Sequence, residues 1–266
     1  MVRRSAPASQ SDCEVNVRLS FPLTAGLLIA SGLSPAATMT PSASRAFDSY
    51  VATVEARLGK PHPGTGHVSI EPVNGGSWKV DGGLLHHWRA SAIVPGARAE
   101  DLLELLRDHD HLARYYAPEV VASHARPNGV AMRFEKHQVV TVVLDTEFET
   151  KSGLNGPGRG FSISRSTHIW QVDNPGSRRE RRLPEGDDDG YLWRLNSYWN
   201  FTETPEGLLM ECEAVSLTRD VPLGLGWLVM PVIRTLPRTS LEFTMNATRK
   251  ALPDFAERRH NDARAD

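Results

Sequence analysis

The stretch YLWRLNSYWNF, residues 191–201, and the segment that follows it decide the fold. Alternate residues of an extended chain share a face, and one of the two sets is rich in aromatic side chains. The stretch therefore predicts a β-strand with one apolar face. That face carries Tyr191, Trp193, Leu195, Ser197, Trp199 and Phe201. The turn residues TPEG at 204–207 then predict a hairpin, with 208–219 as the returning strand.

The charges of this hairpin favour one register. Pairing of Glu203 with Leu208 places Met210 and Cys212 beside the aromatic face. A shift by one residue would carry the acidic residues of the second strand onto that apolar face, so this register is expected. The opposite, polar face then carries Arg194, Asn196, Tyr198, Asn200, Glu211, Glu213 and Arg219.

A Gly/Pro-rich corner, VPLGLG at 221–226, leads from the hairpin into a C-terminal helix. Trp227 opens an apolar helical turn, and Pro237 suits a first helical position, where its missing N–H has no partner to lose. Residues that recur at helical spacing after it are Leu241, Thr244, Met245, Thr248 and Leu252. Pro253 disfavours the helical conformation of the residue before it, so the helix is expected to end at Leu252.

The rest of the chain predicts an α+β protein. A helix is expected at 47–58, a small hairpin or irregular segment at 63–83, a strand at 84–94, a helix or short helical pair at 99–117, and strands at 120–125, 130–137, 138–150 and 161–172. The segment 173–190 carries basic and acidic clusters that nearly cancel, and is expected to be a long hairpin connection. Successive strands with helices at the ends predict a curved antiparallel β-sheet covered by the long C-terminal helix.

Composition narrows the class of protein. The chain has 266 residues, 40% hydrophobic and 23% charged, which is typical of a globular protein. Its formal net charge of −2 argues against nucleic-acid binding, which usually needs a basic surface. The only cysteines, Cys13 and Cys212, form no disulfide framework.

The N-terminal residues resemble a targeting segment. Arg18 precedes the apolar run FPLTAGLLIASGL at 21–33, which is too short to span a bilayer. Small residues follow, as at a signal-peptidase site. We expect an exported protein if this run is a signal peptide and a cytoplasmic one if it is a tail. The expected division is a signal-like segment and linker (1–46), an N-terminal helix with an irregular extension (47–83), the main domain (84–252) and a polar tail (253–266).

No motif for catalysis or metal binding is present. His86 and His87 are neighbours in a predicted strand and face opposite ways, so they cannot hold one ion together. There is no HExxH spacing and no Cys pair, so no metal and no cofactor are expected. There is no GxSxG elbow. Ser164, Ser166 and His168 alternate on one strand and are interpreted as part of a polar sheet face.

The element order resembles the START/polyketide-cyclase (SRPBCC) superfamily, and in particular a bacterial branch of it. The segments that carry the resemblance are GYLWRLNSYWNF, LLMECEAVSLTRDVPLGLGWL and PRTSLEFTMNATRKAL, and it covers about residues 84–252. It implies a helix-grip fold, in which the C-terminal helix closes over the sheet and a cavity holds lipids, sterols, polyketides or other apolar molecules.

The resemblance implies a protein that binds or carries a hydrophobic small molecule, and a transient membrane contact is compatible with that role. The expected ligand-binding residues are Trp193, Trp199, Met210, Trp227, Met245, Arg194, Tyr198 and Glu213. Two simpler interpretations stay open: the aromatic face is ordinary core, and the polar face is a solvated convex surface with cross-strand ion pairs. An aromatase/cyclase with an Arg/Tyr/Glu cluster in the cavity is one functional alternative, and a structural role with a filled cavity is another. No catalytic residue is assigned, and the oligomeric state stays open.

Overall fold

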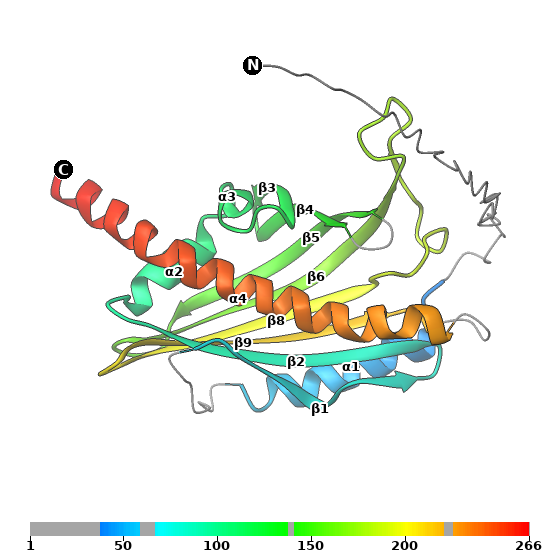
Figure 1. The fold of residues 1–266 in the computed structure, drawn as a ribbon, viewed down its shortest axis with the longest axis horizontal. Helices are drawn as coiled ribbons and strands as arrows, with labels where there is room; N and C mark the ends of the chain where they lie inside the picture. The colour runs from blue at the N-terminus through cyan, green and yellow to red at the C-terminus, as the bar shows by residue number, and fades with distance from the viewer. Residues whose placement is uncertain (1–37, 59–66, 138–140, 221–225, 266) are drawn as a thin grey trace, which may run out of the picture. The chain divides into compact units, whose positions relative to one another are not determined.

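The computed structural model describes residues 38–58, 67–137, 141–220 and 226–265. Its helices and strands follow one another in the order seen in Figure 1. The elements are α1 (Pro41–Glu55), β1 (Ser69–Val80), β2 (Gly83–Val94), α2 (Ala99–Arg107), α3 (Leu112–Tyr115), β3 (Val120–Arg126), β4 (Gly129–His137), β5 (Thr141–Leu154), β6 (Arg159–Asp173), β7 (Arg181–Arg182), β8 (Arg194–Thr204), β9 (Gly207–Thr218) and α4 (Gly226–Ala265). The apolar run 21–33 and the corner 221–225 lie outside the described residues.

One antiparallel sheet organises the described chain. Its strand order is β1-β2-β9-β8-β6-β5-β4-β3, and the short β7 pairs with β6. The long helix α4 crosses this sheet (Figure 1). A curved antiparallel sheet with a short helical pair after β2 and a long C-terminal helix is the helix-grip architecture that the sequence predicts, so the predicted fold is confirmed.

The predicted β8–β9 hairpin has the expected register. Glu203 pairs with Leu208 and Trp199 pairs with Cys212. Gly207 closes the turn with φ +132°, and a Cβ there would lie 2.5 Å from the carbonyl oxygen of Val94. Only glycine fits both the backbone angle and this close approach to β2.

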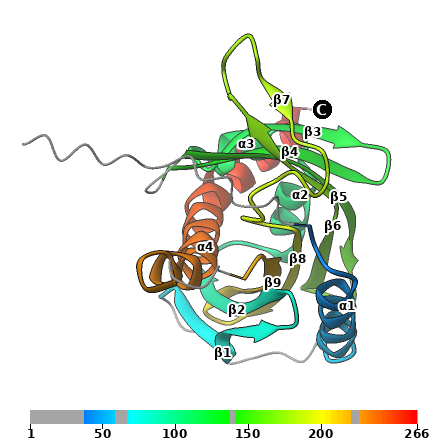
Figure 2. The ribbon, with the colours of Figure 1, turned by 90° about the vertical axis from the view of Figure 1, so that its right-hand side faces the viewer.

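The sheet has a helix on each face, as Figure 2 shows. On the face toward α4, here called the inner face, Met245 packs in one core cluster with Trp199 and Met210. On the face toward α1, the outer face, Phe47 packs in a second cluster with Tyr198. Because neighbouring residues of a strand point to opposite faces, β8 and β9 supply side chains to both clusters.

The predicted end of the C-terminal helix is wrong. α4 runs for 40 residues and passes through Pro253 instead of ending before it. A proline inside a helix removes one hydrogen bond, but tertiary contacts continue beyond it: Phe255 packs against the inner core, and Arg259 Nη1 lies 2.7 Å from Asp101 Oδ1 of α2. These contacts stabilise the last turns and outweigh the local preference.

Two N-terminal predictions also need correction. The first helix begins at Pro41, not at residue 47, because Thr40 caps it by accepting a hydrogen bond from the Ala43 amide at 3.0 Å. Residues 69–80 form β1, a strand of the sheet paired with β2, in place of a small hairpin or irregular segment. Among the helices that the structure describes, none combines the length and the apolar character that a bilayer crossing requires.

Candidate functional site

The middle of the inner face carries a row of side chains that solvent reaches. Four residues, one from each of four adjacent strands, are paired in register across β2, β9, β8 and β6. This inner row is Trp88, Ala214, Ser197 and Ser164. All four are half-buried, whereas the next row on the same face is fully buried. That neighbouring row is Ala90, Cys212, Trp199 and Ser162. Because three of its four side chains are small, the inner row is less covered than the neighbouring row.

The polar atoms of the inner row have no partners among the described residues. The indole N–H of Trp88 is buried and makes no hydrogen bond there. Within the same part of the chain, the Ser164 and Ser197 hydroxyls make no side-chain hydrogen bond. A buried donor without a partner is costly, and in native proteins it usually has one, protein or otherwise.

Apolar side chains lie beside the inner row. Leu195 of β8 and Phe243 of α4 are half-buried and pack in the cluster that contains Phe148. At the edge of this region the Lys136 ammonium lies 5.9 Å from the centre of the Phe243 ring and pairs with Glu119. Apolar walls with a few convergent polar groups are typical of small-molecule sites.

Three of the sequence-predicted site residues come together on the inner face. Trp199, Met210 and Met245 belong to one cluster, with exposed fractions of 5%, 0% and 0%. At this depth they behave as packed core, which was one of the two open interpretations. Trp227 lies in the first turn of α4, but its side chain is outside the described residues.

The other predicted residues lie on the outer face, so the set does not form one site. Trp193 was expected on the aromatic face. It precedes β8, which begins only at Arg194. It packs against the core cluster of Phe47 and Tyr198 on the outer face, and its indole N–H donates to Asp188 at 3.2 Å. Tyr198 and Glu213 are buried beneath α1. The polar face is therefore neither a solvated surface nor part of the α4-covered side.

Glu213 is the centre of the polar contacts beneath α1. Its carboxylate accepts two hydrogen bonds from Arg57, at 2.6 and 3.0 Å, and one from His87 Nε2 at 2.8 Å. Arg89 Nε lies 3.4 Å from the same group. Burial by itself would raise the Glu213 pKa, but these donors hold it well below its usual range.

His87 connects Glu213 to α1. Its Nδ1 lies 2.8 Å from the Tyr50 hydroxyl, which also accepts a hydrogen bond from Asn74 at 3.0 Å. A carboxylate only accepts, so His87 donates from Nε2 and Nδ1 accepts from Tyr50. The ring is fully buried, and burial lowers its pKa and favours this neutral form.

A second set of polar contacts lies beside the first. Glu55, at the end of α1, accepts hydrogen bonds from Arg165 Nε at 2.7 Å and from the Tyr198 hydroxyl at 3.0 Å. Asn196 Nδ2 donates to the same hydroxyl at 3.0 Å. Burial raises the pKa of Tyr198. We refer to both sets together as the outer cluster: Tyr50, Glu55, Arg57, His87, Arg89, Arg165, Asn196, Tyr198 and Glu213.

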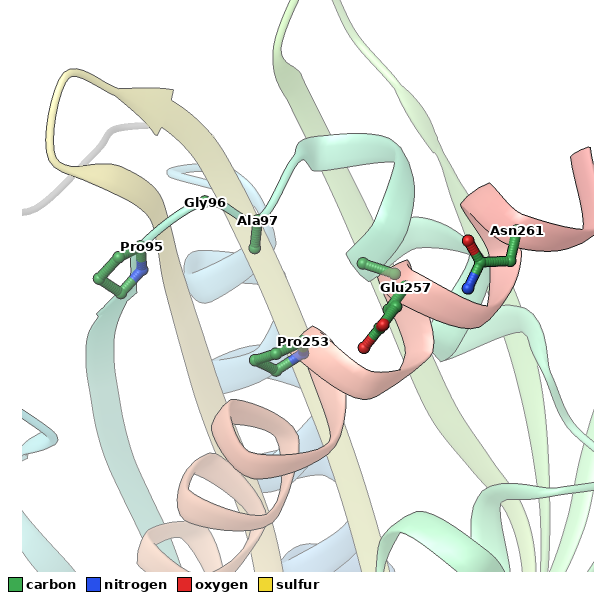
Figure 3. Close-up of a pocket in the computed structure, with 7 residues that line it drawn as sticks. Pro95, Gly96, Ala97, Pro253, Glu257 and Asn261 are labelled. Carbon is green, nitrogen blue, oxygen red and sulfur yellow. The ribbon is translucent and has the colours of Figure 1, made fainter. Parts of the chain in front are cut away.

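Two hollows lie away from the inner row. One of about 140 Å³ is beside Tyr198 and Leu58 on the outer face. The other, of about 420 Å³, lies between the β2–α2 turn and the C-terminal part of α4, as Figure 3 shows. Its lining combines Pro95, Gly96 and Ala97 with the polar Glu257 and Asn261 of α4. Neither hollow combines apolar walls with a buried polar atom that lacks a partner.

The remaining chemical expectations concern histidines. His86 and His87 face opposite ways, as predicted: His86 contacts Ser77 and Thr218, whereas His87 contacts Glu213. His168 follows an irregularity in the β5–β6 register and is exposed, while Ser166 is buried. In the described parts of the chain, no three His, Cys, Asp or Glu side chains are placed to hold a metal ion.

Comparisons with known proteins add likenesses of fold. No protein-family model matches the chain. No curated protein matches it either. Among solved structures, a START superfamily protein from Mycobacterium smegmatis is 13% identical, with 64% of this chain and 97% of that chain covered and a TM-score of 0.40. A STAR-related lipid transfer protein from Xanthomonas axonopodis is 17% identical, covering 71% and 99%, with a TM-score of 0.39. A Streptomyces aromatase/cyclase is 15% identical, covering 66% and 95%, with a TM-score of 0.34.

The chain's own architecture defines the class. Its sheet order, the helical pair after β2 and α4 across the inner face give it the helix-grip fold. The inner face is the side of the sheet that α4 covers.

Proposed function

We propose that this protein binds a hydrophobic small molecule on the inner face, over the inner row. One observation carries the proposal: the inner row is half-buried between the sheet and α4, while the row beside it is closed. Burial of about 200 Å² of apolar ligand surface would contribute about 5 kcal/mol before the costs of association. A lipid-sized or polycyclic ligand that buries more apolar surface would gain in proportion.

The polar atoms of the inner row favour a ligand with one or two oxygen atoms. The Trp88 N–H donates only, so it suits a carbonyl or hydroxyl oxygen. The Ser164 and Ser197 hydroxyls donate or accept. A ligand that contacts these atoms would satisfy groups that have no partner among the described residues.

Binding is favoured over catalysis at this row. Indole and serine groups do not change protonation near neutral pH without a neighbouring base. Arg194, Tyr198 and Glu213, which the aromatase/cyclase alternative would use as an Arg/Tyr/Glu cluster, lie on the outer face. The carrier function is therefore the candidate that the geometry supports best.

Ligand titration of the unmodified protein, and of a variant with a larger side chain in the inner row, tests the proposal. Titration with palmitic acid, cholesterol and fluorenone, followed by calorimetry and native mass spectrometry, is expected to show saturable one-to-one binding of at least one compound. Ala214→Leu should weaken that binding about tenfold or more, because the larger side chain occupies the ligand's space. The matched control Ala125→Leu, on an exposed position of β3, should bind as the unmodified protein does.

Two outcomes would contradict the proposal. The first is no binding of any of the three compounds by the unmodified protein, together with no adduct on protein purified from its own host. The second is unchanged affinity in Ala214→Leu that circular dichroism shows to be folded.

A further inference from the structure

The outer cluster lies directly behind the inner row. Trp88 stands between His87 and Arg89 in β2, and Ala214 follows Glu213 in β9. Successive side chains of a strand point to opposite faces, so these pairs are back to back through the sheet.

The same arrangement repeats in the other two strands. Ser197 stands between Asn196 and Tyr198 in β8, and Ser164 precedes Arg165 in β6. Every residue of the inner row therefore has a neighbour in its own strand that belongs to the outer cluster.

α1 and the turn after it reach all four of these strands. Tyr50 bonds to His87 of β2, and Arg57 bonds to Glu213 of β9. Glu55 bonds to both β8 and β6, through Tyr198 and Arg165. Three side chains from one segment thus connect the four strands that carry the inner row.

We propose that α1 and the turn after it form a positioning element for the ligand site, acting through the sheet. Its hydrogen bonds hold β2, β9, β8 and β6 at one spacing and curvature, and so set the shape of the inner row that a ligand meets. This inference rests on the proposed function, since it concerns the same site. It names Tyr50, Glu55 and Arg57 as positioning residues, which act without touching the ligand.

The chemistry of the outer cluster fits positioning better than stability alone. Buried ion pairs are often replaceable by apolar side chains without loss of stability, whereas hydrogen bonds with fixed directions specify one arrangement. Arg57 binds both oxygens of Glu213, and His87 binds through both ring nitrogens. Such contacts tolerate little displacement of the strands.

Thermodynamic coupling makes the proposal testable, because two linked regions must influence each other equally. Binding of a ligand on the inner face should therefore slow amide hydrogen exchange in α1, although α1 lies on the other face. A segment that is only a structural cover would show no such response.

The test uses the full chain and the neutral apolar fluorophore N-phenylnaphthylamine. Arg57→Met removes the contacts to Glu213 and keeps much of the side-chain length. Arg133→Met is a matched control: Arg133 also binds a carboxylate, Asp145, and its side chain is 31% exposed against 32% for Arg57. Arg133 lies on β4, outside the four strands of the inner row.

Arg57→Met is expected to bind the fluorophore about fivefold or more weakly, and Arg133→Met with unchanged affinity. Fluorophore binding should slow exchange in residues 50–57 of the unmodified protein and of Arg133→Met, and not in Arg57→Met. Tyr198→Phe, which removes only the hydroxyl bonded to Glu55, provides a second variant with a smaller loss of affinity.

Each contrary result has a clear meaning. If the unmodified protein binds the fluorophore but Arg57→Met or Tyr198→Phe binds it equally well, the positioning role is overturned and the proposed function stands. Ligand binding without any change of exchange in α1 would also overturn it. If the unmodified protein binds neither the fluorophore nor the three test ligands, the proposed function itself fails.

Discussion

The two faces of the sheet use polar residues in opposite ways. On the outer face, Glu213 and His87 are buried and hydrogen-bonded to each other; Glu213 also accepts from Arg57, and His87 from Tyr50 of α1. On the inner face, the Trp88 N–H is buried and has no partner among the described residues. Arg89 Nε and Asn196 Oδ1 of the outer cluster are also buried without a hydrogen bond among the described residues. The faces differ in another respect: the outer polar groups lie against α1 and the turn after it, whereas solvent reaches the small side chains of the inner row.

The charged residues and the solvent-accessible small residues lie on different faces of the sheet. The ionised side chains lie in the outer cluster, so charge alone would mark that cluster as the ligand site. The inner row has no ionisable side chain, yet solvent reaches its Ala and Ser residues. For an apolar ligand, accessible space beside a few neutral donors matters more than charge.

The largest expected effect comes from removing the centre of the outer cluster. Glu213→Ala leaves Arg57, Arg89 and His87 without their shared carboxylate beneath α1. Loss of one partner from a buried ion pair costs about 3–5 kcal/mol. Urea unfolding followed by circular dichroism should show a loss of about that size, and Ala214→Leu, next to it on the inner face, should change stability less. Equal losses in the two variants would contradict the contrast between the faces.

The outer cluster also predicts how stability depends on pH. Burial lowers the His87 pKa from its ordinary 6.5, so the stability it confers is complete above that value and is lost as the pH falls below it. The Glu213 pKa is held below its ordinary 4.5, so its contribution is lost in turn as the pH falls below 4.5. Unfolding free energy should therefore decline in two overlapping stages on acidification.

Two variants test which residue causes each stage of the decline in unfolding free energy. His87→Gln should reduce the pH dependence of unfolding free energy as the pH falls below about 6.5, and Glu213→Gln should reduce it below about pH 4.5. His86→Gln is the comparison variant on the inner face, because His86 is as deeply buried as His87. If it abolished the first stage and His87→Gln did not, the assignment to the outer face would be wrong.

The sequence predicts those features that depend on neighbours in the chain. The β8–β9 register follows from alternation, turn residues and the placement of acidic side chains, and the structure has it. The predicted end of α4 and the predicted face of Trp193 are wrong, because each depends on tertiary contacts that local sequence patterns do not contain. Arg259 supports the helix from a distance, and Trp193 lies in the turn before its strand.

The candidate sites were only partly accessible to sequence reasoning. Glu213 was singled out, but its partner Arg57 is 156 positions away and His87 is 126 positions away. Ala214, Ser197 and Ser164 carry no sequence signal for a site, since small residues are common in strands. They become a row only when the register of four strands is known.

The smallest effect compares two tryptophans that differ in the partner of their N–H group. Trp193→Phe breaks a hydrogen bond to Asp188, whereas Trp88→Phe removes a donor with no partner among the described residues. Both variants lose similar ring area, so loss of the N–H hydrogen bond should make Trp193→Phe less stable than Trp88→Phe by about 1 kcal/mol.

For ligand affinity we expect the larger effect in Trp88→Phe. Trp88→Phe should lower the affinity for fluorenone, which has a carbonyl, by about fivefold relative to fluorene, which has none. Trp193→Phe should leave that ratio unchanged, and an unchanged ratio in both variants would show that the Trp88 N–H does not meet the ligand.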